Sequence, residues 1–207
     1  MHLFQHIEYV TSAHALTQLP ADAVAEVAFA GRSNAGKSSA LNTLAHRKKL
    51  AHVSKTPGRT QLINFFAFAP GVFLVDLPGY GYAKVPDKIR GHWEASLGAY
   101  LRKRPQIRGM VLLMDARRPL TEIDRQMLDF YRPSPNRPVH ILLSKADKLT
   151  RREAAATLAA ATKECAAWTG CTVQLFSSLS KLGVEEAVAV VEGWIAPYLP
   201  ETSAAPA

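Results

Sequence analysis

The sequence predicts an α/β fold, in which helices cover both faces of a mostly parallel sheet. Short apolar segments alternate along the chain with longer amphipathic ones, as in strands that are joined by helical crossovers. The segments VLLMDA and HILLS present apolar side chains on both faces, which is typical of parallel strands that are buried on both sides. A length of 207 residues, of which 48% are apolar and 20% charged, suits one domain with a sizeable core.

Six strands are expected, at 26–30, 61–68, 72–76, 109–115, 139–144 and 172–176. The first ends before a glycine-rich turn, the second carries phenylalanine on both faces, and the third is an apolar run that ends in Asp76. Five helices are expected, at 37–45, 88–102, 121–131, 151–169 and 184–196. The second of these is basic, and the fourth is rich in alanine, which is a strong helix former.

The rest of the chain is expected to form extensions and loops. The polar segments 47–60 and 80–87 contain glycine and proline and are predicted to be mobile loops beside the phosphates, as a nucleotide switch requires. We expect an N-terminal extension at 1–22 that packs on the domain, the domain itself at 23–199, and a flexible tail at 200–207.

Basic residues outnumber acidic ones by 25 to 17, which gives a formal charge of +8. An excess of this size favours association with a polyanion such as RNA. Any one basic pair is explained equally well as a solvated helix face, so the expectation rests on the whole set. The set comprises Arg47, Lys48, Lys49, Lys88, Arg90, Arg102, Lys103, Arg104, Arg117, Arg118, Arg132, Arg137, Arg151 and Arg152.

The sequence also favours a monomer in a reducing cytoplasm. No apolar run reaches the roughly 18–20 residues that span a bilayer, and the N-terminus lacks the pattern of a secretion signal. The two cysteines, Cys165 and Cys171, have neither a metal-ligand spacing nor a disulfide framework and are expected to be free thiols.

A complete phosphate-binding loop, G-x-x-x-x-G-K-[ST], lies between the first predicted strand and the first predicted helix. Its glycines allow close approach, and its backbone N–H groups and the helix N-terminus point at phosphate. Lys37 is expected to contact the β- and γ-phosphates, and the Ser38 hydroxyl to bind Mg²⁺. The candidate residues are Gly31, Arg32, Ser33, Asn34, Ala35, Gly36, Lys37, Ser38 and Ser39.

Two further motifs follow strands and complete a nucleotide site. Asp76, Leu77, Pro78 and Gly79 form the first, in which Asp76 is expected to hold Mg²⁺ through water and the Gly79 N–H to sense the γ-phosphate. The second selects the base, because a carboxylate accepts two hydrogen bonds from guanine, whereas adenine offers no such donor pair. It consists of Ser144, Lys145, Ala146 and Asp147, and backbone N–H groups of Ser177, Ser178 and Leu179 are expected at guanine O6.

A second hydroxyl ligand for Mg²⁺ is expected at the end of the first loop. Thr60 is the favoured candidate because it directly precedes a strand, and Thr56 competes for the role. The residues that we expect to act on the transferring phosphoryl group are Lys37, Thr60 and Gly79.

The segments GRSNAGKSSALN, TPGRTQLINFF, DLPGYGYAKV and LSKADKL resemble the EngB (YihA/YsxC) family of bacterial ribosome-biogenesis GTPases, in the TrmE–Era–EngA–YihA–Septin-like class. The resemblance runs from about Val24 to Trp194. It implies a P-loop NTPase three-layer sandwich with a six-stranded sheet, one strand of which is antiparallel, and an EngB-type GTPase domain at 23–199. It also implies a first switch contact made by Gly58, Arg59, Thr60, Gln61 and Leu62. Ser144 departs from the family pattern, where Thr or Asn is usual.

The resemblance implies GTP and GDP binding with Mg²⁺, slow hydrolysis, a role on the large ribosomal subunit, and an association with septation and cell division. Tyr80 stands where many GTPases have a Gln that orients the attacking water, which also predicts slow intrinsic hydrolysis. In related GTPases an Asn at the position of Asn34 helps to bind K⁺, which then neutralises transition-state charge. The alternative is that Asn34 only shapes the loop.

Three classes of function remain open. The favoured one is a GTP-driven switch in assembly of the large ribosomal subunit. The others are a GTPase associated with RNA modification, for which no catalytic domain is left over in 207 residues, and a protein-binding regulator of septation that acts without RNA. A small-molecule kinase is disfavoured because Asp147 reads guanine.

Overall fold

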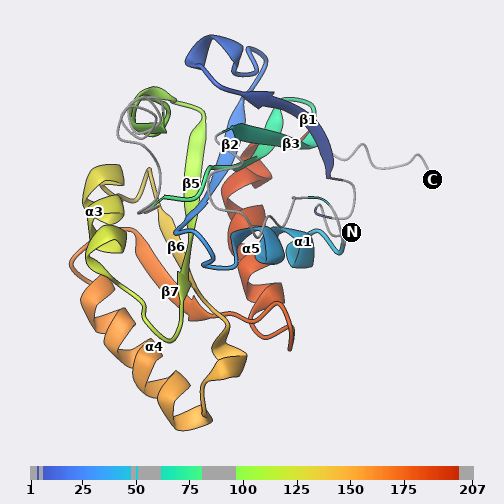
Figure 1. Ribbon diagram of the computed structural model, residues 1–207. Coiled ribbons are helices and arrows are strands. Elements are labelled where there is room, and N and C mark those ends of the chain that lie inside the picture. Colours follow the sequence, from blue (N-terminus) through green and yellow to red (C-terminus); the bar gives the residue numbers. More distant parts are fainter. Residues whose placement is uncertain (1–3, 5–6, 48–49, 51–61, 81–96, 201–207) are drawn as a thin grey trace.

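The computed structural model describes residues 4, 7–47, 50, 62–80 and 97–200 (Figure 1). It contains a seven-stranded sheet in the order β1-β3-β4-β2-β5-β6-β7. The strands are β1 (Glu8–Ala13), β2 (Ala25–Gly31), β3 (Ile63–Ala69), β4 (Val72–Asp76), β5 (Ile107–Asp115), β6 (Val139–Ser144) and β7 (Cys171–Leu175). The helices are α1 (Lys37–Leu44), α3 (Glu122–Tyr131), α4 (Arg151–Cys165) and α5 (Val184–Ile195), and residues 97–103 are also helical.

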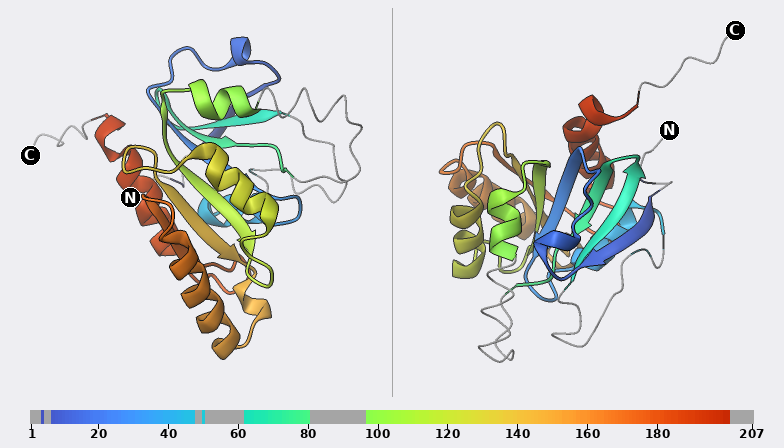
Figure 2. Two further views of the ribbon diagram at one scale, coloured as in Figure 1. Left: turned by 90° about the vertical axis from the view of Figure 1, so that its left-hand side faces the viewer. Right: turned by 90° about the horizontal axis from the view of Figure 1, so that it is seen from above.

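Helices lie on both faces of the sheet, so the predicted α/β class is confirmed. Figures 1 and 2 show α3 and α4 on one side, and α1 and α5 on the other. Each side has its own apolar core: Leu101, Leu128 and Ala161 pack on one face, whereas Leu41 and Val191 pack on the other. The central strands β2 and β4 are buried along their whole length, as expected of strands that are covered on both sides.

The strand count differs from the expectation because the N-terminal segment adds β1 to the sheet. β1 pairs antiparallel with β3, and β3 also runs antiparallel to β4, so β3 is the strand that opposes its neighbours. In β1 only Ala13 is buried, and Tyr9 and Val10 are exposed. An edge strand with so little apolar patterning gives a weak sequence signal.

The predicted bounds hold at β4 and β6 and differ elsewhere by a few residues. The largest difference is at α4, which ends at Cys165 rather than at residue 169. A turn follows in which Trp168 N–H donates to the Cys165 carbonyl at 3.0 Å, and Gly170 takes a positive φ of 81° before β7. Of the helix predicted at 88–102, residues 88–96 lie outside the described part of the chain.

A buried charge pair fixes the helical segment 97–103 against the start of β2. Glu26 is fully buried, and its Oε1 accepts from Arg104 Nε at 2.8 Å and from Arg104 Nη2 at 2.6 Å. The Tyr100 hydroxyl donates to Glu26 Oε2 at 2.7 Å. Arg104 is therefore part of the interior network and does not belong to the basic surface that the sequence suggested.

Candidate nucleotide-binding site

The predicted phosphate and base motifs meet at one edge of the sheet. β2, β4, β5, β6 and β7 run parallel to one another, so the loops that follow their carboxyl ends gather on the same side. Ligands of open α/β sheets bind at that side.

The phosphate loop turns from β2 into α1 through two residues of positive φ, Asn34 at 62° and Gly36 at 93°. Gly36 is the N-cap of α1, so the N–H groups of the first turn open toward the loop. Gly31 lies so close to β5 that an added Cβ would be 2.9 Å from the Leu113 carbonyl oxygen. The loop is thus tightly seated on the sheet, and Ser38 and Ser39 are half-buried in the first turn of α1.

Lys37 and Asp76 form an ion pair at the centre of the site. Their side chains are only 11% and 9% exposed, so each charge depends on its partner. Asp76 Oδ2 also lies 3.5 Å from Asn64 Nδ2, and Asn64 Oδ1 accepts from Ser12 Oγ at 2.6 Å. These two side-chain contacts, from Ser12 to Asn64 and from Asn64 to Asp76, connect the edge strand β1 to the carboxylate that is expected to face the metal.

Asn64 is a site residue that the sequence reasoning missed. It lies opposite Asp76 in the β3–β4 register and opposite Ser12 in the β1–β3 register. The available signal was a polar amide inside the apolar strand segment INFF. That signal could not be interpreted without the register of the three strands.

Ser144 and Lys145 connect the base motif to the phosphate loop. The buried Ser144 hydroxyl donates to the Ala35 carbonyl at 2.5 Å, so the hydroxyl at this position has a defined contact. Lys145 Nζ donates to the Asn34 carbonyl at 2.7 Å and pairs with Asp115 Oδ2 at 2.9 Å. Its side chain therefore crosses the site from β6 to the loop.

Asp115 is a second site residue that the sequence reasoning did not single out. Asp115 is the last residue of β5. The guanidinium of Arg117 donates two hydrogen bonds to its carboxylate, from Nε to Oδ1 at 2.9 Å and from Nη2 to Oδ2 at 2.7 Å. The hydrogen bonds from Arg117, followed by that from Lys145, hold the pKa of Asp115 well below its ordinary value. Asp115 thus remains an anion and anchors Lys145.

Asp147 lies in the short turn Ala146–Lys148 that follows β6. Its Oδ1 accepts from the buried Ser177 hydroxyl at 2.6 Å, and Lys148 Nζ is 3.6 Å from Oδ2. The Ser177 hydrogen bond lowers the pKa of Asp147, so the side chain is an ionised acceptor at neutral pH. An ionised carboxylate at this place has the chemistry that guanine N1–H and N2–H₂ require.

The loop after β7 is organised around the same Ser177 hydroxyl. Leu179 N–H donates to Ser177 Oγ at 3.2 Å and Ser180 N–H at 3.1 Å, while Ser177 N–H donates to the Leu182 carbonyl at 3.0 Å. In this structure Ser177 therefore fixes Asp147, a role that the sequence reasoning did not assign. That backbone N–H groups of 177–179 reach guanine O6 stays a prediction.

Part of the first switch contact lies outside the described residues. The residues that are not described include Gly58, Arg59, Thr60 and Gln61, and also Thr56, which competes with Thr60 for the role of metal ligand. Leu62, which is half-buried just before β3, is described. The second hydroxyl ligand for Mg²⁺ and the roles of Gly58–Leu62 at the γ-phosphate therefore stay predictions.

The described donor set fits a magnesium ion that relies on phosphate and water. Within residues 4, 7–47, 50, 62–80 and 97–200, no group of three or more His, Cys, Asp or Glu side chains could hold a metal. Mg²⁺ needs no such cage, because it keeps several waters and is typically bound by one or two carboxylates together with substrate phosphates. Asp76 beside the first turn of α1 supplies that single carboxylate. None of the helices among the described residues combines the length and the apolar character that a membrane span requires.

Comparison with known proteins agrees with this geometry. A family model described as a 50S ribosome-binding GTPase matches residues 26–145. The probable GTP-binding protein EngB of Methylobacillus flagellatus is 60% identical over 202 residues, which cover 97% of this chain and 96% of the relative. The probable GTP-binding protein EngB of Dechloromonas aromatica is 54% identical over 198 residues, which cover 94% of this chain and 90% of the relative.

Two solved structures support the fold. A crystal structure of a probable GTP-binding protein EngB has a TM-score of 0.62 at 20% identity and covers 84% of this chain and 100% of its own. Aquifex aeolicus Era bound to GDP and AlF₄⁻ has a TM-score of 0.66 at 23% identity and covers 86% of this chain and 57% of its own. With its phosphate loop, its Asp76 and Asp147 carboxylates and these close relatives, the chain belongs to the EngB family of GTP-binding proteins.

Proposed function

We propose that this GTP-binding protein hydrolyses GTP slowly, with Mg²⁺, and acts as a switch in assembly of the large ribosomal subunit. GTP binding and hydrolysis follow from the family. The observation that carries the nucleotide site is that Lys37 pairs with Asp76, and Asp147 with Ser177, at one edge of the sheet. The description of the matching family as 50S ribosome-binding supports the choice of the large subunit.

Each part of the site has a defined task in this proposal. The N–H groups of the phosphate loop and the first turn of α1 hold the phosphates, and Lys37 offsets the charge of the β- and γ-phosphates. Ser38 and, through water, Asp76 would hold Mg²⁺, which supplies further charge neutralisation on the phosphoryl oxygens. The Gly79 N–H senses the γ-phosphate, and Asp147 selects guanine.

Tyr80 supports slow intrinsic hydrolysis. Its side chain is only 5% exposed, and its hydroxyl donates to Asp124 Oδ1 at 2.9 Å. The phenol is therefore engaged with α3 and is not directed to a position from which it would orient an attacking water. Catalysis in this site depends on positioning and on cationic charge.

We expect GTP turnover to be faster in KCl than in NaCl at equal ionic strength. Asn34 is exposed in the loop at a positive φ, and its carbonyl accepts from Lys145 Nζ, which holds the loop in shape. A cation beside Asn34 would stabilise negative charge on the transferring group. Steady-state phosphate release in the two salts measures the effect, and Asn34→Ala should remove the difference. Equal rates of the unaltered protein in both salts would exclude the K⁺ role.

Exposed basic side chains support a partner that contains RNA. Lys103, Arg118, Arg132, Arg151 and Arg152 are exposed in the structure. Contacts of such side chains with RNA phosphates are lost as counterions compete. The protein is proposed to act as a cytoplasmic monomer.

Co-sedimentation with purified large subunits tests this partner against a septation regulator that acts without RNA. We expect more protein in the subunit pellet with a non-hydrolysable GTP analogue than with GDP, and steep release as salt rises. Small subunits serve as the control for charge-driven binding. A protein that stays in the supernatant with both nucleotides at low salt would contradict the ribosomal proposal and favour the septation regulator.

A further inference from the structure

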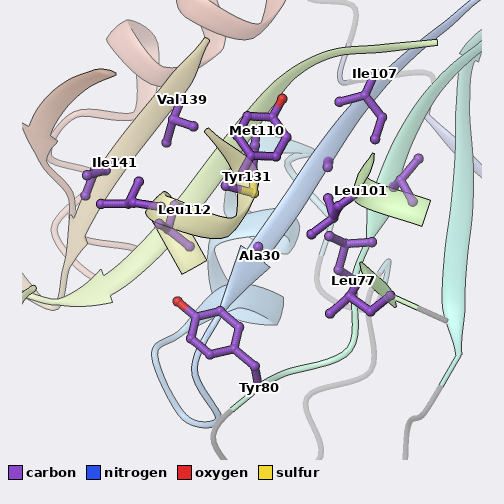
Figure 3. Packing of buried hydrophobic residues seen from close by; sticks show 14 of the residues in the cluster. Ala30, Leu77, Tyr80, Leu101, Ile107, Met110, Leu112, Tyr131, Val139 and Ile141 are labelled. Carbon is purple, nitrogen blue, oxygen red and sulfur yellow. The ribbon is translucent and has the colours of Figure 1, made fainter. Parts of the chain in front are cut away.

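Three segments that are distant in the sequence meet at the carboxylate of Asp124. Asp124 is fully buried at the start of α3, and its Oδ1 accepts from the Tyr80 hydroxyl at 2.9 Å. Arg32 Nε, from the phosphate loop, lies 3.2 Å from the same oxygen. Figure 3 shows the ring of Tyr80 turned toward the other residues of its core cluster. One buried oxygen therefore contacts the phosphate loop and the residue that directly follows Gly79.

The other oxygen of Asp124 caps its own helix. Oδ2 accepts from Thr121 N–H at 3.0 Å and from Thr121 Oγ1 at 2.7 Å, which forms the capping box of α3. α4 has a capping box of the same kind, in which Glu153 Oε2 accepts from Thr150 N–H at 2.8 Å and from Thr150 Oγ1 at 2.7 Å. Glu153 is exposed, and Asp124 is not. The cap alone therefore does not explain why Asp124 is buried against two nucleotide loops.

The backbone reinforces this arrangement. Tyr80 N–H donates to the Gly31 carbonyl at 3.3 Å, and Ser33 N–H donates to the Tyr80 carbonyl at 3.1 Å. Tyr80 is thus fixed by its main chain to the phosphate loop and by its hydroxyl to α3. Burial, and then the nearby charge of Asp124, raise the pKa of Tyr80 far above its ordinary value, so the phenol keeps its proton at neutral pH and can donate it to Asp124.

We propose that Asp124 and Tyr80 are positioning residues for recognition of the γ-phosphate. By holding the residue after Gly79 against the phosphate loop, they present the Gly79 N–H in a fixed place, so that little ordering is needed when a triphosphate binds. A diphosphate lacks the group that Gly79 senses and gains nothing from this order. The cluster thus raises the affinity for GTP relative to that for GDP, and the proposal rests on the function proposed above.

Tyr80→Phe is the sharpest test because it removes one hydroxyl and keeps the ring in the core. We expect the affinity for a non-hydrolysable GTP analogue to fall about fivefold to tenfold, the effect of losing one buried hydrogen bond, while the affinity for GDP stays unchanged. Isothermal titration calorimetry with both nucleotides gives the ratio of affinities. That ratio is the readout, since a merely structural role would change both affinities together or neither.

Tyr100→Phe is the matched control. Tyr100 is fully buried in the same core cluster, and its hydroxyl donates to Glu26 Oε2 at 2.7 Å, so the control removes one buried hydrogen bond to a carboxylate without touching the phosphate loop. Its ratio of affinities should equal that of the unaltered protein. Circular dichroism confirms that both variants are folded before titration.

A double-mutant cycle tests Asp124 itself. Asp124→Asn keeps the size of the side chain, and its effect on the affinity ratio should overlap that of Tyr80→Phe, so that the double variant loses little more than either single one. Additive effects would contradict the proposal, as would an unchanged ratio in folded Tyr80→Phe. If the unaltered protein bound neither nucleotide, the proposed function itself would fail, which is a different result from an unchanged ratio.

Discussion

Asp147→Asn is expected to change the preferred base from guanine to xanthine. The carboxylate of Asp147 offers two acceptors to the two donors of guanine, whereas an amide offers one acceptor and one donor. Xanthine presents a matching donor and acceptor, and guanine then meets a donor with a donor. Because a buried polar group without its partner costs about 1–3 kcal/mol, and a charge-assisted contact is lost as well, GTP affinity should fall about a hundredfold or more.

Ser177 fixes the orientation of the side chain in this variant. Its hydroxyl donates to Oδ1 of Asp147, so it would hold the oxygen of the new amide in the place of Oδ1 and leave the amide NH₂ in the place of Oδ2. Titration with GDP and with xanthosine diphosphate measures the change in selectivity. Asp129→Asn provides the matched control, since Asp129 is an exposed residue of α3 that accepts from Trp168 Nε1 at 2.9 Å and should leave selectivity unchanged. An Asp147→Asn protein that still prefers guanine would exclude Asp147 as the base-reading residue.

Lys37→Ala is expected to lose most of the affinity for triphosphate. Each charge-assisted hydrogen bond is worth about 1.5–3 kcal/mol, and Lys37 is assigned one to each of two phosphates. GTP affinity should therefore fall at least about a hundredfold, and GDP affinity should fall less because one of the two contacts does not exist for it. Fluorescence titration with labelled GTP and GDP measures both.

The variant also removes the ion pair with Asp76, so its effect on folding is measured separately. Urea unfolding of the nucleotide-free protein gives the change in the free energy of unfolding. Lys163→Ala, at an exposed position near the end of α4, controls for the loss of one positive charge. If folded Lys37→Ala bound GTP as tightly as the unaltered protein, the phosphate-loop assignment would be wrong.

The sequence predicted the positions of the phosphate and base motifs because each is local. A strand that ends in Gly31, Asp76 or Ser144 is recognisable from its apolar run, and parallel pairing then brings these ends together. The bounds of β4 and β6 could be predicted because β4 is apolar up to Asp76, β6 is apolar up to Ser144 except at His140, and each strand ends in a polar residue.

The contacts that hold the site together could not be predicted in the same way. Asn64, Asp115 and Asp124 act through partners that are 12, 30 and 44 residues away, so their roles depend on strand register and on the packing of α3. The T-x-x-D pattern of Thr121 and Asp124 indicates a helix cap, but nothing local indicates that the second oxygen faces the nucleotide loops. The role of Ser177 likewise needs the turns after β6 and β7 to be adjacent.

The edge strand β1 has a practical consequence for the design of shortened forms. A chain that began at residue 23 would expose the backbone donors and acceptors of β3 along the segment that now pairs with Glu8–Ala13. Exposed strand edges recruit other strands, so such a fragment is at risk of aggregation even though every nucleotide motif is retained. It would also lose the Ser12 hydroxyl that orients Asn64 beside Asp76. Affinity tags are therefore better attached at the opposite terminus, and the leading residues are best kept intact.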